Sequence, residues 1–163
     1  QAEETIVNGS KKLIPTRLMR LYEDTLIVTK AKVKSSTNAS SDSLSIKGDI
    51  AVADMNLDAN EPNLVNENVV IAWGDVNDAN TQTFTIPAGS FKASKKGHLY
   101  KCGKINPVIT PVEDVNTLVT ASIDLDKCTF TVSITKSDLE VVSGDAKFGL
   151  SFAAFDETDE LSL

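Results

Sequence analysis

Apolar and polar residues alternate most regularly over residues 118–136. The apolar positions form two series, one on each side of Asp126-Lys127: Val119, Ala121, Ile123 and Leu125, then Cys128, Phe130, Val132 and Ile134. A two-residue turn at Asp126-Lys127 would place each apolar residue of the first series opposite one of the second, on a single face. The pattern predicts an antiparallel hairpin with the pairs Leu125/Cys128, Ile123/Phe130, Ala121/Val132 and Val119/Ile134.

Six further runs with a period of two predict short strands at residues 25–34, 43–53, 68–76, 81–88, 98–104 and 147–155. In the last run, four residues share one predicted face: Phe148, Leu150, Phe152 and Ala154. Between the runs lie turn-rich segments, including a polar loop at 35–43 and a turn at Pro87-Ala-Gly89. Seven or eight short strands without alternating helical segments predict an all-β fold, a sandwich or a small barrel.

The first 24 residues differ from the rest of the chain. An apolar Thr5-Ile6-Val7 precedes a turn signal at Asn8-Gly9, and Leu13-Ile14-Pro15 follows. Residues 16–24 fit a helical face and an extended strand equally well. We therefore divide the chain into an N-terminal arm or first strand at 1–24 and a β-sandwich domain at 25–163.

The composition limits the classes of partner. A chain of 163 residues with 41% hydrophobic and 24% charged residues suffices for one domain with a hydrophobic core. Its formal net charge of −7 repels phosphate backbones and anionic lipids, so we expect neither nucleic-acid nor membrane-surface binding. No segment approaches the roughly 20 apolar residues that a membrane-spanning helix needs.

The two cysteines, Cys102 and Cys128, both occur in strand-like contexts. They predict one disulfide, which would stabilise the fold by about 3 kcal/mol on the chain-entropy model. The alternative is two free, buried thiols. Because C-x-x-C spacing is absent, zinc is not expected. A disulfide would place the protein outside the cytoplasm, and a chain that begins with Gln1 fits removal of a signal peptide or of a tag.

The titratable residues give no pattern typical of an enzyme. His98 follows Lys95-Lys96-Gly97 and fits a solvated turn histidine better than a catalytic base. Carboxylate pairs such as Glu113/Asp114 and Glu157/Asp159 are expected in solvated loops or tails, without the aromatic neighbours of a sugar subsite. Trp73 follows an apolar run and is more typical of a core residue than of a sugar platform. We expect a non-enzymatic protein.

Two clusters of oxygen-bearing side chains suggest calcium as the only cofactor to consider. The first consists of Asp54, Asn56, Asp58, Asn60 and Glu61, and the second of Asp75, Asn77, Asp78 and Asn80. Alternating carboxylate and amide oxygens suit Ca²⁺, but the EF-hand pattern fails at Ala59 and Val65. The other interpretation is a turn in which Asp and Asn bond to their own backbone.

Two short segments match the acceptor pattern for N-linked glycans, Asn8-Gly-Ser10 and Asn38-Ala-Ser40. The pattern matters only in a host that glycosylates proteins.

Several stretches carry a family resemblance: Ser-Ile-Lys-Gly at 45–48, Ile-Pro-Ala-Gly-Ser-Phe-Lys at 86–92, Leu-Tyr-Lys-Cys at 99–102, Ile-Asp-Leu-Asp-Lys-Cys-Thr-Phe-Thr-Val at 123–132 and Phe-Gly-Leu-Ser-Phe at 148–152. With them, residues from about 44 to 163 resemble secreted bacterial immunoglobulin-like β-sandwich modules of exported or surface-attached proteins. The resemblance implies an immunoglobulin-like sandwich and an extracellular or cell-surface location. It assigns no catalytic residue and leaves residues 1–43 uncovered.

An incomplete sandwich has an open edge that an extended segment of another subunit can fill. Residues 1–21 could be that segment, with a set of apolar side chains for contact: Ile6, Val7, Leu13, Ile14 and Leu18. The alternative is a first strand that pairs within its own domain. We expect a secreted structural subunit that associates with copies of itself, in a filament, or with other surface proteins. The alternative function is a surface module that binds a glycan or calcium.

Overall fold

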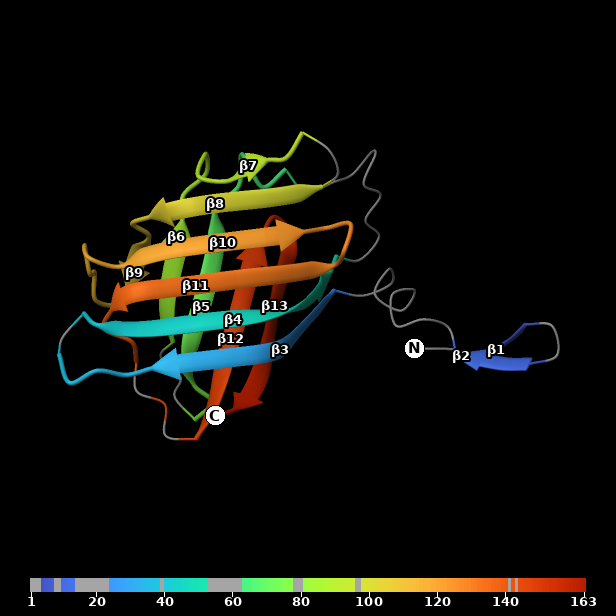
Figure 1. Cartoon of the computed structure of the whole chain (residues 1–163), viewed down its shortest axis with the longest axis horizontal. Coiled ribbons are helices and arrows are strands. Elements are labelled where there is room, and N and C mark those ends of the chain that lie inside the picture. The colour runs from blue at the N-terminus through green and yellow to red at the C-terminus, as the bar shows by residue number, and fades with distance from the viewer. Residues whose placement is uncertain are drawn as a thin grey trace.

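The computed structural model describes residues 4–7, 10–13, 24–38, 40–52, 63–77, 81–95, 98–140, 142 and 144–163. Within these ranges the chain is all-β, and two antiparallel sheets face each other (Figure 1). This is the arrangement of a β-sandwich, as the spacing of the alternating runs predicts.

The first sheet has six strands: β3 (Thr25–Lys34), β4 (Asp42–Ala51), β11 (Thr129–Ser137), β10 (Leu118–Asp124), β8 (Leu99–Ile105) and β7 (Lys92–Ala93), in that spatial order. The second has five: β13 (Phe155–Ser162), β12 (Asp145–Phe152), β5 (Val69–Asp75), β6 (Gln82–Ile86) and β9 (Val108–Thr110). Two further strands, β1 (Glu4–Val7) and β2 (Ser10–Leu13), pair with each other in a separate two-stranded sheet.

The predicted hairpin over residues 118–136 is confirmed in its register. Val119 pairs with Ile134, Ala121 with Val132 and Ile123 with Phe130, and all six side chains are buried. The turn differs from the prediction, because the ladder ends at Asp124 and Thr129 and residues 125–128 form a four-residue loop. The predicted pair Leu125/Cys128 is therefore not part of the ladder.

The side chain of Asp124 explains this longer turn. Its Oδ1 accepts the N–H groups of Asp126 and Lys127, each at 3.0 Å. Cys128 adopts a positive φ of 56°, which reverses the chain at the end of the loop. An Asx-type turn followed by a left-handed residue is a common way to build a four-residue hairpin loop.

The predicted strand at 147–155 is wrong at its C-terminal end. β12 ends at Phe152, the chain turns at Ala153 and Ala154, and β13 returns beside it. Ala154 is consequently exposed, whereas Phe148, Leu150 and Phe152 are buried as predicted. β13 was not predicted, because apart from Phe155 its positions are mostly polar.

One hydrophobic core fills the space between the inner faces of the two sheets. It draws residues from both sheets and includes Trp73, which is fully buried as predicted. The ring of Phe130 on β11 stacks on that of Phe148 on β12, with centroids 5.6 Å apart and planes 5° from parallel. Such parallel aromatic pairs contribute beyond the area that they bury.

The edge strands β3 and β13 meet along one side of the molecule. The N–H of Val28 on β3 donates to Oδ2 of Asp159 on β13 at 2.8 Å. At this point β3 carries a bulge, since its register with β4 shifts between Val28 and Lys30. A bulge and an acceptor from the other sheet both protect an edge strand from pairing with another chain.

We predict that Asp159→Ala lowers the free energy of unfolding by about 1–2 kcal/mol, because it removes a charged acceptor from a partly buried N–H. The matched control is Asp156→Ala on the same strand, whose side chain is exposed. It should change stability by no more than about 0.5 kcal/mol. Urea unfolding followed by circular dichroism measures both, and equal effects of the two variants would contradict the role given to Asp159.

Candidate functional site

The first predicted calcium cluster cannot be placed. Its members Asp54, Asn56, Asp58, Asn60 and Glu61 lie outside the described residues, as do Asp78 and Asn80 of the second cluster. Asp75 and Asn77 are described, and Oδ1 of Asp75 accepts the N–H of Asn77 at 2.9 Å, as in an Asx turn. Over the described ranges, no three His, Cys, Asp or Glu side chains gather as a metal site.

Only one of the two glycan acceptor patterns has its asparagine among the described residues. Asn8 lies outside the described residues, whereas Asn38 is exposed in the β3–β4 connection. The hydroxyl of Ser40 in the same pattern donates to Oδ2 of Asp114 at 2.8 Å. Asp114 also accepts the N–H of Asn116 through Oδ1, so this carboxylate lies in a loop, as predicted, but it is half-buried and organises the loop.

The predicted disulfide between Cys102 and Cys128 is not formed, and both thiols are free. The register explains the correction. Cys102 pairs with Ala121, which pairs with Val132 on the next strand, so Cys102 lies level with position 132. Position 128 lies just before that strand, about 13 Å from position 132 at the rise of an extended chain, whereas a disulfide needs Cα atoms about 4.4–6.8 Å apart.

The two thiols have different surroundings. Cys102 is buried in the core, and its Sγ donates to the carbonyl oxygen of Gly103 at 3.3 Å. Burial raises the pKa of the Cys102 thiol, because the core disfavours the thiolate. Cys128 is half-buried in the β10–β11 turn, where its Sγ donates to the carbonyl oxygen of Leu125 at 3.6 Å. The sulfur of Cys102 is therefore the less reactive of the two.

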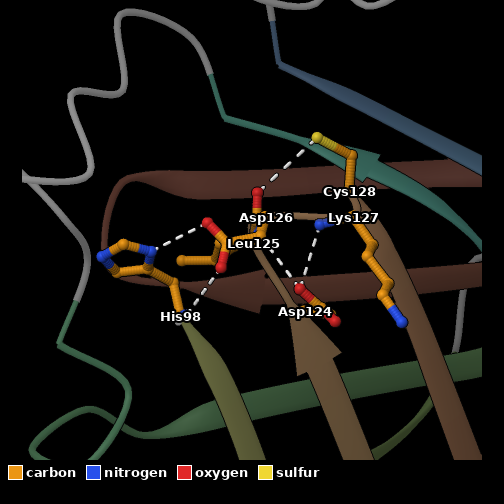
Figure 2. Close-up of polar contacts among 6 residues, drawn as sticks. All are labelled: His98, Asp124, Leu125, Asp126, Lys127 and Cys128. Carbon is orange, nitrogen blue, oxygen red and sulfur yellow. Dashed lines mark hydrogen bonds and ion pairs between the residues drawn. The ribbon is translucent and has the colours of Figure 1, made fainter. Parts of the chain in front are cut away.

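The one histidine binds a carboxylate at the same turn (Figure 2). Nδ1 of His98 lies 2.9 Å from Oδ1 of Asp126, and the backbone N–H of His98 donates to Oδ2 of Asp126 at 3.0 Å. A third bond runs from the N–H of Leu125 to the carbonyl oxygen of His98, at 3.0 Å. His98 precedes β8, as predicted, but a solvated turn histidine was expected, and the imidazole instead faces the carboxylate of Asp126.

An imidazole whose Nδ1 faces a carboxylate is the base of many nucleophilic sites. The nearest candidate nucleophile in this turn is Cys128, but its thiol donates to Leu125, and Figure 2 shows it on the opposite side of the turn from His98. The contacts between His98 and the β10–β11 turn support the fold rather than a reaction. They join the start of β8 to the β10–β11 turn, two segments far apart in the sequence.

A cavity of about 200 Å³ lies at one end of the core, beside Trp73. Its lining comes from the β3–β4 connection, from β5 and from residues that follow β11, and includes Ser36, Asp42, Leu139 and Glu140. The indole Nε1 of Trp73 is buried and has no acceptor among the described residues. Asp42 accepts the N–H groups of Ser36 at 2.7 Å and of Leu139 at 3.0 Å. The contacts of Asp42 thus hold the β3–β4 connection and the segment after β11 together at this cavity.

The structure places part of the predicted subunit-binding arm. Ile6 and Val7 lie in β1 and Leu13 lies in β2, and the two strands pair from Glu4 with Leu13 to Val7 with Ser10. Ile14 and Leu18 lie outside the described residues, and so does the predicted turn at Asn8-Gly9.

Comparison with known proteins finds no matching family, no similar curated protein and no similar solved structure. In the part of the chain that the structure describes, no helix is long and apolar enough to cross a membrane. The function must therefore be inferred from the chain's own geometry.

We predict that a thiol reagent modifies Cys128 faster than Cys102 in the folded protein, and that both react equally fast in urea. Single Cys→Ala variants assign the two rates. Faster labelling of the Cys102 thiol in the native state would contradict its burial.

The raised pKa of Cys102 also predicts a pH dependence of stability. Below the ordinary thiol pKa of about 8.5, the Cys102 thiol is protonated in both the folded and the unfolded state, and the protein has its full stability. Above this pH the thiol ionises in the unfolded state while it stays protonated in the folded state, so the free energy of unfolding falls as the pH rises. The free energy of unfolding should decline less steeply above this pH in Cys102→Ala than in the parent. Parallel declines would argue against a buried thiol at this position.

We predict that Asp126→Ala destabilises the fold by about 1 kcal/mol, because it removes both acceptors from His98. Lys127→Ala in the same turn is the matched control, since Lys127 is exposed and only its backbone N–H bonds to Asp124. Chemical unfolding of the two variants decides the point, and a control as destabilised as Asp126→Ala would refute it.

Proposed function

We propose that the chain is a non-enzymatic structural subunit of an extracellular or cell-surface assembly, whose copies associate by β-strand pairing through residues 1–21. One observation carries the proposal. The two large sheets are built from strands within residues 25–163, whereas among the described strands β1 and β2 pair with each other and with no other. Within that part of the chain each of the two strands has one edge without a sheet partner, and such an edge can pair with an edge strand of a second copy.

Among the edges of the two large sheets, β9 offers the best acceptor. β3 and β13 meet through Val28 and Asp159, and β7 is only two residues long. β9 pairs with β6 on one side, and its Val108 is 53% exposed. The loop that follows adds Val112 and Val115, which are 75% and 76% exposed.

Val108 on the edge strand β9 is thus followed closely in the sequence by two more exposed apolar residues, Val112 and Val115. Exposed apolar groups of this kind mark contact surfaces in many proteins. Ile6, Val7 and Leu13 on the arm are suitable counterparts, and Ile14 and Leu18 extend the apolar series in the sequence. Since the arm and the β9 edge are different surfaces, the contact is head-to-tail and builds a filament unless it closes into a ring.

The proposal also includes an immunoglobulin-like type of sandwich and an extracellular location. Two packed antiparallel sheets are compatible with an immunoglobulin-like sandwich, and the resemblance of residues 44–163 to exported modules supports an extracellular location. The free thiols of Cys102 and Cys128 give that location no support.

The experiment is deletion of residues 1–21. The truncated chain should keep a β-type circular dichroism spectrum and cooperative unfolding, but it should sediment as a monomer at concentrations where the full chain forms assemblies. In the full chain, Val112→Ser/Val115→Ser should weaken association, whereas Asp156→Ser, an exposed position on β13, should not.

Two outcomes would overturn the proposal. One is undiminished assembly of the folded, truncated chain in sedimentation and negative-stain micrographs. The other is a full chain that stays monomeric at every concentration tested.

A further inference from the structure

The outer face of the six-stranded sheet concentrates positive charge, although the chain carries a net charge of −7. Six of its 16 basic residues lie on this face, on the strands nearest the two edges of the sheet: Lys30, Lys32 and Lys34 on β3, Lys47 on β4, Lys101 on β8 and Lys92 on β7. All six are exposed, and on β3, β4 and β8 they alternate with residues that are buried or half-buried. We call this surface the lysine face.

The strand register aligns these residues in rows across the sheet. One row reads, from β3 to β7, Lys30, Lys47, Thr131, Ser122, Lys101 and Lys92. The next row contains Lys32, Ser45, Ser133 and Thr120. With strands about 4.8 Å apart, the first row extends roughly 24 Å. Hydroxyl groups thus occupy the centre of the face, and ammonium groups lie on both sides.

A hollow of about 240 Å³ lies at the β3 side of the lysine face, lined by Lys30, Lys32, Ser45 and Lys47. The bulge between Val28 and Lys30 shifts the register of β3 here and brings Lys30 directly opposite Lys47. Like charges in directly opposed positions are unfavourable in a sheet. An anionic group in the hollow would relieve this repulsion and accept hydrogen bonds from the ammonium groups and from Ser45.

Few carboxylates compete for these lysines on the same face. Asp49 and Asp124 lie in the adjacent row, on either side of Thr129. Oδ1 of Asp124 accepts the N–H groups of Asp126 and Lys127. Among the described residues, none of the six lysines takes part in an ion pair.

We propose that the lysine face binds an acidic polysaccharide. A carboxylate or sulfate group of the polymer occupies the hollow at Lys30, Lys32 and Lys47, and the chain continues over the central hydroxyls to Lys101 and Lys92. Repeated anionic groups match the two separated groups of lysines, and the sugar hydroxyls exchange hydrogen bonds with the Ser and Thr side chains between them. This surface does not depend on the strand-pairing proposal.

The alternatives fit this face less well. Single-stranded nucleic acids bind through aromatic side chains that stack on the bases, and the described outward positions of the six strands carry no aromatic residue. The net charge of −7 works against long-range attraction of any dense polyanion. Binding is therefore short-range and sensitive to salt.

The experiment measures binding of the full chain to polygalacturonate, dextran sulfate and neutral dextran by calorimetry, at low and high NaCl. We expect binding to at least one acidic polymer, weaker at high salt, and none to dextran. Lys47→Glu/Lys101→Glu, which changes both sides of the hydroxyl region, should weaken binding at least about tenfold. Lys47→Gln/Lys101→Gln provides a milder variant should the first fail to fold.

The matched control is Lys127→Glu/Lys147→Glu, which makes the same change in net charge away from the lysine face. Lys127 lies in the β10–β11 turn and Lys147 on the other sheet. An equal loss of binding in this control would show that net charge alone decides, and would overturn the proposal. If duplex DNA or phosphatidylserine vesicles bind more tightly than the acidic polysaccharides, the choice of ligand is wrong. If no acidic polysaccharide binds at low salt, the lysine face is not a binding site for them.

Discussion

Contact between the inner faces of the two sheets is the interaction on which the rest of this structure depends. The stacked rings of Phe130 and Phe148 join a strand from the middle of one sheet to a strand of the other. Neither sheet could remain in water with this face exposed, because each inner face is almost entirely apolar. The alternation along every long strand follows from this single requirement.

Burial of the inner faces decides where function can occur. The side chains that remain available lie on the outer faces, on the edges and in the turns. On the edges, Asp159 accepts the N–H of Val28, whereas β9 is an edge strand of the second sheet in the described part of the chain and carries the exposed Val108. On the outer face of the larger sheet, the same alternation that buries Ala31 and Val33 directs the lysines of β3 outward. Both proposals therefore use surfaces created by the packing of the core.

The parts of the fold that could be predicted are those in which the two faces of a strand differ strongly. The β10–β11 register follows from the alternation alone, because a shift of one residue would expose Phe130 and bury Thr131. β13 could not be recognised in this way, because Glu157 and Asp159 occupy the face of the strand that it shares with the buried residues of β12. An edge strand tolerates polar residues at such positions, since they reach the opposite edge or water.

The candidate sites were less predictable, because they depend on distances between strands. The predicted disulfide was wrong for this reason, because the strand-like sequence around each cysteine does not determine how the two strands are aligned. Asp126 was not predicted as the partner of His98, although both residues were predicted to lie in turns. The lysines of β3 were visible as an alternating series, but a net charge of −7 conceals how unevenly the charge is distributed.

The most direct test of the central claim is a nuclear Overhauser measurement between aromatic rings in solution. The packing of the two sheets predicts a strong cross-peak between ring protons of Phe130 and Phe148, whose centroids are 5.6 Å apart. Resolved signals from both rings with no cross-peak between them would contradict the contact between the sheets and everything inferred from it.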